Sequence, residues 1–202
     1  MNPWSLPVKV EIGGVTYGIH ADYRDILDII GYLNNRKEPE FIRWLVALAL
    51  FYDKEIPQGN QVDAMEYLIQ FINCGKAEDP TPAPQLLDWE LDAQAIVADV
   101  NKVAGFEVRS VPFLHWWTFV SYFSAIGEGQ LSMLVSIRDK LHRNKKLEKW
   151  EMEYYKKNRN AVDLPCRNIP VDQTGQDWLD RLAGKVGGDF GIRRESNNIH
   201  GA

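Results

Sequence analysis

Cysteine is scarce in this 202-residue chain: only Cys74 and Cys166 occur, and no CxxC pair is present. Zinc sites built from cysteine need closely spaced pairs of ligands, and the four histidines are scattered along the chain. The sequence therefore argues against a structural zinc site. We expect both thiols to be free, as they are in a reducing cytoplasm.

Basic charge and long hydrophobic runs are also in short supply. The 28 Asp and Glu outnumber the 23 Lys and Arg and give a net charge of -5, which argues against a general nucleic-acid-binding protein. The longest strongly apolar run, residues 44–52, is too short to span a bilayer, so we expect no membrane partner. Residues 1–12 lack the basic stretch and apolar core of a signal peptide.

Signatures of the common enzyme classes are missing as well: GxxxxGK[ST], GxGxxG, HExxH and GxSxG do not occur. The acids of residues 88–99 could suit a metal site, but we favour a solvated first helical turn, where acids complement the helix dipole. His115 could be a general base, yet it has no identifiable carboxylate or nucleophile partner, so we expect a core histidine with one hydrogen bond. We predict no enzymatic activity, no catalytic residue, no metal and no cofactor.

What the chain does have is aromatic residues, at 11% of the total with seven tryptophans. They are densest in residues 113–123, FLHWWTFVSYF, where eight of eleven residues are large and apolar or aromatic. At helical spacing these side chains cover every side, so the helix must be buried on several faces. Pro112 fits its start and Gly127 its end. We therefore predict a central, largely enclosed helix over residues 110–125.

The flanking patterns predict a mainly α fold. An N-terminal β-hairpin at residues 8–19, with Ile12 opposite Val15 across Gly13-Gly14, packs on helices. A helical C-terminal unit then forms around the buried aromatic helix. The other predicted helices span residues 22–34, 39–52, 60–75, 88–104, 130–142 and 145–160. The predicted organisation is a hairpin plus three-helix unit (1–75), a Pro-rich linker (76–86), a helical unit (87–165) and an extended, partly flexible tail (166–202).

Residues 138–159 form the most basic segment, with nine Lys and Arg against four Asp and Glu, a net +5. Aromatic residues between the cations suit stacking on single-stranded nucleic acid. An exposed helix with Glu-Lys pairs, such as Glu153 and Lys157, is the simpler interpretation. The charge separation also suits a basic helix that meets the acidic face of another subunit or protein.

Several pieces of this sequence resemble, in order, the bacteriophage gene-product-fifteen family, whose members are small proteins encoded beside the tail tape-measure gene. The central piece is LHWWTF at residues 114–119, and the resemblance extends over about residues 7–165. The other pieces are the opening VEIGGVTYGIHADYRDILDI (10–29), Leu91-Asp92-Ala93, Gly105-Phe106, Val135-Ser136-Ile137-Arg138, YYKKNR (154–159) and Asp163-Leu164-Pro165. The chain departs from the family pattern at IRDK (137–140), where glycine-tyrosine-arginine is commoner, and in its longer tail.

The resemblance implies a tail assembly chaperone of a long-tailed phage. Such a protein binds the tape-measure protein, keeps it soluble and promotes tail tube assembly, so the implied partners are the tape measure, further copies of itself and the tail tube protein. It would act in the host bacterial cytoplasm and be absent from the mature virion. The alternatives are a structural tail or head-tail connector component and a nucleic-acid-binding regulatory phage protein. The expected partner-binding residues are Trp116, Trp117, Phe123, Lys145, Lys146 and Trp150.

Overall fold

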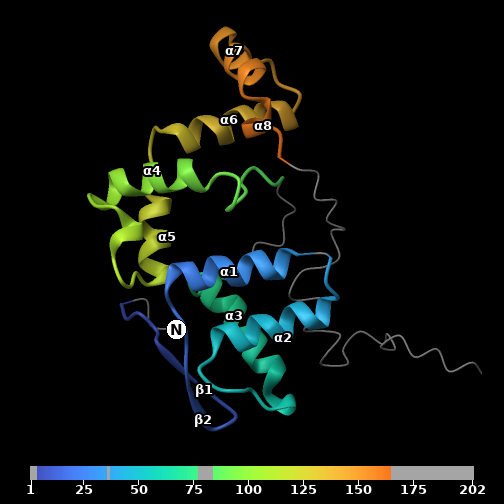
Figure 1. The fold of residues 1–202 in the computed structure, drawn as a ribbon, viewed down its shortest axis with the longest axis vertical. Helices are drawn as coiled ribbons and strands as arrows, with labels where there is room; N and C mark the ends of the chain where they lie inside the picture. The colour runs from blue at the N-terminus through green and yellow to red at the C-terminus, as the bar shows by residue number, and fades with distance from the viewer. Residues whose placement is uncertain (1–3, 36, 77–83, 165–202) are drawn as a thin grey trace, which may run out of the picture.

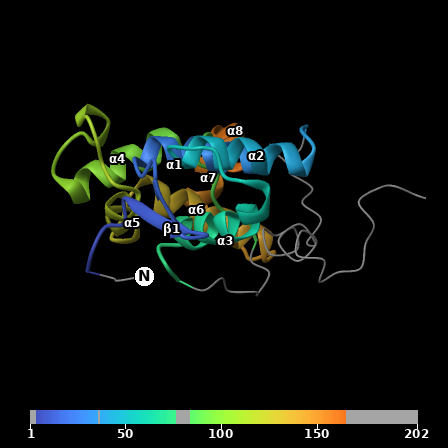
Figure 2. The same cartoon turned by 90° about the horizontal axis from the view of Figure 1, so that it is seen from below.

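The computed structural model describes residues 4–35, 37–76 and 84–164, so most of the predicted linker and all of the predicted tail lie outside the described residues. Along the long axis of Figure 1, the hairpin and helices α1 to α3 occupy one end, and α4, α6, α7 and α8 the other. Helix α5 lies between these two groups, and the view from below in Figure 2 shows α4 and α5 together on one side. The predicted fold class, mainly helical with an N-terminal hairpin, is confirmed. Within the described residues, no helix is long and apolar enough to cross a membrane.

The hairpin has the predicted register. Strands β1 (Lys9–Ile12) and β2 (Val15–Gly18) are antiparallel, with Ile12 opposite Val15. Gly13 and Gly14 both have positive φ, as a two-residue loop between twisted strands requires. Tyr17 and Ile12 are buried, whereas Val15 is exposed, so the apolar face of the hairpin is covered only in part.

The next three helices follow the predicted pattern closely. They are α1 (Tyr23–Asn34), α2 (Glu40–Phe51) and α3 (Gln61–Ile72), the last preceded by the short 3-10 helix η1 (Gln58–Asn60). The Asp22 side chain caps α1 by accepting a hydrogen bond from the Arg24 amide. Ile26, Phe51 and Phe71 are fully buried, which places the core of this end between the three helices.

The C-terminal helices are shorter than predicted at three boundaries. The elements are α4 (Ala93–Ala104), η2 (Val108–Ser110), α5 (Trp116–Ser124), α6 (Gln130–His142), α7 (Lys149–Lys157) and α8 (Arg159–Val162). Helix α4 begins at Ala93 instead of residue 88 because Asp88 caps a separate turn, accepting from the amides of Glu90 and Leu91. The predicted basic helix 145–160 is two helices, separated at Asn158, whose side-chain amide donates to the Tyr154 carbonyl.

The predicted start of the central helix at residue 110 is also wrong. Residues 111–115 form no helix, because the backbone of residues 114–116 bonds to the segment that leads into α1. The Tyr23 amide donates to the Leu114 carbonyl at 2.9 Å, and the Trp116 amide donates to the Ala21 carbonyl at 2.8 Å. Asp22 adds a third link by accepting from the Leu114 amide at 2.9 Å. Sequence patterns could not show this pairing because the two segments are about ninety residues apart.

The two ends of the molecule share one apolar core. The rings of Tyr23 on α1 and Phe119 on α5 stack 4.5 Å apart and 8° from parallel. Phe71 of α3 lies against Trp117, with ring centroids 5.9 Å apart. Helix α5 therefore joins the N-terminal helices to α4, against which it also packs.

Candidate partner-binding surfaces

The LHWW segment supplies hydrogen-bond donors to the C-terminal end of α3. The indole N–H of Trp116 donates to the Ile72 carbonyl and that of Trp117 to the Phe71 carbonyl, both at 2.9 Å. The last carbonyls of a helix have no partner within the helix. Here Trp116 supplies a donor for the Ile72 carbonyl, and Trp117 adds a second donor to the Phe71 carbonyl, which also accepts from the Cys74 amide at 3.0 Å. This pair of tryptophans therefore positions α3 against α5.

Three of the six predicted partner-binding residues lie on α5, and none of the three is exposed. Trp116 and Trp117 are buried, and Phe123 is half-buried with its ring 5.0 Å from that of Trp89. Their part in partner binding stays a prediction. In this conformation the two indole rings belong to the molecule's own core, and Phe123 packs against that core.

His115 begins α5 and lies among aromatic rings. Its Nδ1 accepts a hydrogen bond from the Trp117 amide, and its Nε2 lies 2.9 Å from the Pro7 carbonyl oxygen. The expected core histidine is therefore found, with two hydrogen bonds rather than one. Burial lowers its pKa below the ordinary value of 6.5, because the charged ring would be desolvated, and the Pro7 carbonyl offsets this in part.

The lowered pKa of His115 predicts a pH-dependent stability. The unfolded chain takes up a proton near pH 6.5, whereas the folded chain resists it. Stability is therefore fully present above pH 6.5 and falls as pH drops below it, by at most about 1.4 kcal/mol per pH unit for this group. Urea unfolding from about pH 8 to about pH 5 should show a smaller dependence of the unfolding free energy on pH in His115→Asn, which keeps a capping side chain.

His142→Asn, at an exposed histidine, is the control and should keep the wild-type slope. An unchanged slope in His115→Asn would contradict the assignment.

The acids near α4 are not the solvated first turn that the sequence predicted. Asp88, Asp92 and Asp99 are all buried. The expectation failed because each carboxylate bonds to a group that is distant in sequence, or to a turn of its own. Asp99 accepts from the Leu131 amide at 2.8 Å and so caps the start of α6 from α4. A Cβ at Gly129 would collide with this carboxylate, so a larger residue there would force the Asp99 side chain to move.

Arg138 fills the centre of the C-terminal helices. Its guanidinium pairs with both oxygens of Asp92, at 2.7 and 2.8 Å, and both side chains are almost fully buried. The remaining donors reach the carbonyls of Leu86, Ala161 and Val162 at 2.7 to 2.9 Å. Arginine offers five N–H donors in a fixed fork, and all five are used here. This network ties α6 to the start of α4 and to α8, so its role is structural.

The other three predicted residues are exposed and lie together. Lys145 and Lys146 precede α7, and Trp150, which is 56% exposed, is in its first turn. They lie at the end of the molecule farthest from the hairpin (Figure 1). Lys140 and Arg143 pair with Glu151 and Asp139. By contrast, Lys145 and Lys146 form no ion pair with any described residue.

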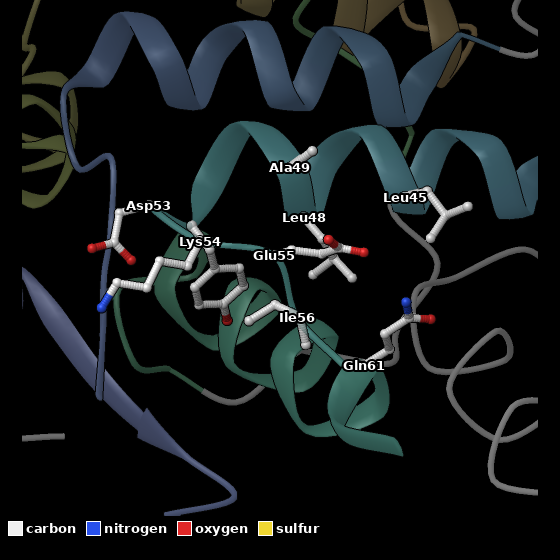
Figure 3. Close-up of a pocket in the computed structure, with 9 residues that line it drawn as sticks. Leu45, Leu48, Ala49, Asp53, Lys54, Glu55, Ile56 and Gln61 are labelled. Atoms are coloured by element: carbon white, nitrogen blue, oxygen red, sulfur yellow. The ribbon is translucent and has the colours of Figure 1, made fainter. Parts of the chain in front are cut away.

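A pocket at the opposite end was missed by the sequence reasoning. It has a volume of about 410 Å³ and lies between α2, the turn after it and the start of α3 (Figure 3). Its apolar wall comes from Leu45, Ala49 and Ile56, with Asp53 and Glu55 at its rim. The available signal was the i, i+4 spacing of apolar residues on α2, but that pattern by itself indicates a buried Leu45, whereas Leu45 is 42% exposed.

Further exposed apolar side chains occur on the last turn of α4 and on the connection from α4 to α5. Val103, Phe106 and Phe113 are 39%, 38% and 54% exposed there. The Phe106 ring meets that of Tyr122 edge-on, with centroids 6.2 Å apart. We call these three exposed residues the α4–α5 corner. They extend from the last turn of α4 through the connection to α5 (Figure 1).

The motif pieces meet in space as well as in order. Asp22 of the DYR piece contacts Leu114 of LHWW, and Asp92 of the LDA piece pairs with Arg138. A family model described as bacteriophage Gp15 protein matches residues 4–164. The chain belongs to the bacteriophage Gp15 family. No curated protein and no solved structure matches it. Membership makes it a phage protein and indicates a role in the structure or assembly of the particle.

Proposed function

We propose that this Gp15-family protein is a tail assembly chaperone that binds the tape-measure protein, keeps it soluble and promotes tail tube assembly. Family membership is the observation that carries the proposal. The protein would act in the host cytoplasm, leave before the virion is complete and catalyse no reaction. Its partners would be the tape measure, tail tube subunits and other copies of itself.

Exposed apolar side chains support this function. A chaperone for a long helical client needs apolar surface that can accept amphipathic helices. Several large apolar residues on the helices and on the connection between α4 and α5 are at least a third exposed in the described part of the chain. Clustered exposed apolar residues mark interaction sites in soluble proteins, and we propose that Val103, Phe106 and Phe113 act together in this way. The α4–α5 corner suits the client best, because it lies on the side of the elongated molecule instead of at an end.

The titratable groups also fit a binding protein better than an enzyme. Buried Asp92, Asp99 and Arg138 bond to backbone groups or to each other and hold helices together. No group of three potential metal ligands occurs among the described residues. These contacts support the proposal that the protein works through its surfaces.

The test is co-expression with the tape-measure protein of the same phage, followed by pull-down and size measurement. A soluble complex with many copies of this protein per tape measure is expected. A tape measure that stays insoluble, with this protein eluting alone, would contradict the chaperone function. Purified virions would then be examined, because a structural or connector component remains in the particle.

Phe106→Glu should reduce the soluble tape measure recovered on co-expression several-fold. A carboxylate at the α4–α5 corner opposes burial of this surface against an apolar client helix. The fold should survive because Phe106 is 38% exposed. Val15→Glu is the matched control, since Val15 is 47% exposed but lies on the hairpin. Equal recovery with both variants would show that the corner is not the client site.

A further inference from the structure

The pocket beside α2 has an apolar wall, and the part of the chain around it carries a net negative charge. Residues 1–76 carry ten Asp and Glu against seven Lys and Arg. Glu55 at the pocket rim makes no ion pair with any described residue. In Figure 3 the ammonium group of Lys54 lies on the Asp53 side, leaving the Glu55 carboxylate beside the apolar wall. A volume of about 410 Å³ falls within the roughly 300–1,000 Å³ of ligand pockets and leaves room for an indole.

The start of α7 has the complementary properties. Trp150 exposes 56% of its surface, and Met152 exposes 38%. Lys145, Lys146 and Lys149 are exposed around this tryptophan, and the wider segment 138–159 has the net +5 charge noted above. Tryptophan and nearby cations are typical of the residues that dominate binding energy at protein interfaces.

These two surfaces cannot meet within one molecule. Helix α7 lies at one end of the long axis, and α2 with its pocket lies toward the other (Figure 1). We infer that Trp150 of one copy inserts into the Leu45, Ala49 and Ile56 pocket of a second copy, with Lys145 and Lys146 facing Glu55 and Asp53. The occupant of the pocket is therefore another copy of this chain.

The charges favour a second copy over other occupants. Acidic pocket and basic helix belong to the same sequence, and each carries an exposed apolar centre, so the two surfaces match in both charge and chemistry. The contact joins different surfaces on the two copies, so each dimer leaves one pocket and one α7 unoccupied. Such heterologous contacts generate rings or open rows. The α4–α5 corner lies outside both surfaces and stays accessible in every copy.

The test uses the purified full-length chain without any client. Sedimentation velocity should show association that increases with protein concentration and weakens with salt, because the contact pairs opposite charges. Trp150→Ala and Leu45→Asp should each weaken association by at least about 30-fold, as for truncation of an interface hot spot. Both residues are more than 40% exposed, so circular dichroism should show native helix content. A strictly monomeric wild-type protein would overturn the inference.

Mixing the two variants gives the sharpest result. Trp150→Ala keeps an intact pocket, and Leu45→Asp keeps an intact α7, so an equimolar mixture has one functional pair of surfaces. A one-to-one dimer with no larger species is expected from two variants that are monomeric alone. A mixture that stays monomeric would overturn the contact, as would either variant associating like the wild type. An isologous dimer that pairs α7 with α7 fails this test, because Leu45→Asp would then associate like the wild type.

A charge exchange checks the register of the contact. Glu55→Lys should weaken association. Mixing this variant with a second protein that carries both Lys145→Glu and Lys146→Glu should restore part of the association. No restoration would overturn the pairing of these charges. Client binding plays no part in these measurements, so the chaperone proposal and the self-association can fail separately.

Discussion

Arg138→Ala is expected to lower the free energy of unfolding by about 3–5 kcal/mol, the usual loss when one member of a buried ion pair is removed. Asp92 would be left charged in the interior, and the carbonyls of Leu86, Ala161 and Val162 would lose their donors. Urea unfolding followed by circular dichroism measures this loss. The predicted effect is large because one side chain makes five hydrogen bonds, to residues 86–92 and to α8.

Arg143→Ala is the matched control, because it removes an arginine from the C-terminal end of the same helix, where Arg143 is the C-cap. Arg143 pairs with Asp139 on the surface, where its side chain is 59% exposed, and its loss should change stability by no more than about 0.5 kcal/mol. Arg138→Lys should recover little of the loss, since a single ammonium group cannot reproduce the planar fork. If Arg138→Ala and Arg143→Ala lowered the free energy of unfolding equally, the buried network would stabilise the fold no more than a surface ion pair does.

Trp117→Ala is expected to cost about 3–5 kcal/mol of unfolding free energy, as for other large-to-small changes of buried aromatic residues. The ring is packed beside Phe71 and His115, and its N–H is one of two donors to the Phe71 carbonyl, the other being the Cys74 amide. The substitution therefore creates a cavity and removes a donor together. Urea unfolding of the full-length protein gives the value, and tryptophan fluorescence would report the loss of the buried ring.

Two further variants separate the causes. Trp117→Phe keeps most of the ring but not the N–H. It should cost about 0.5–1.5 kcal/mol, the usual net loss for one hydrogen bond, because the Phe71 carbonyl keeps the Cys74 amide as a donor. Trp150→Ala removes the same residue type from an exposed site and should change stability by no more than about 0.5 kcal/mol. If Trp150→Ala were as damaging as Trp117→Ala, the structural role assigned to the LHWW segment would be wrong.

Local patterns were sufficient for much of the fold. The Gly13-Gly14 turn and the alternation around it predicted the hairpin register, because a two-residue loop allows only one pairing of the flanking strands. Asp22 predicted the start of α1, since the cap and its helix are adjacent in sequence. The family resemblance was also carried by short ordered motifs, and the family match confirms it.

The candidate surfaces were harder to predict, because exposure depends on what packs against a helix. Leu45 and Trp44 are neighbours on α2 and equally apolar, yet Leu45 lines an open pocket and Trp44 is buried. Trp117 and Trp150 likewise have the same side chain but opposite exposure. Of the six residues proposed for partner binding, the exposed three lie in the basic segment, where charge in the sequence already favours solvent.

The sequence by itself determined the secondary structure of the hairpin and most helices, the mainly helical class and the family, because these depend on neighbours within a few positions. Only the tertiary structure decided that Asp22 meets Leu114, that Asp92 meets Arg138, and that two indoles close the end of α3. Each of these contacts joins residues more than forty positions apart. Such partners are selected by packing and by the cost of leaving a buried polar group unpaired, and no local pattern records that choice.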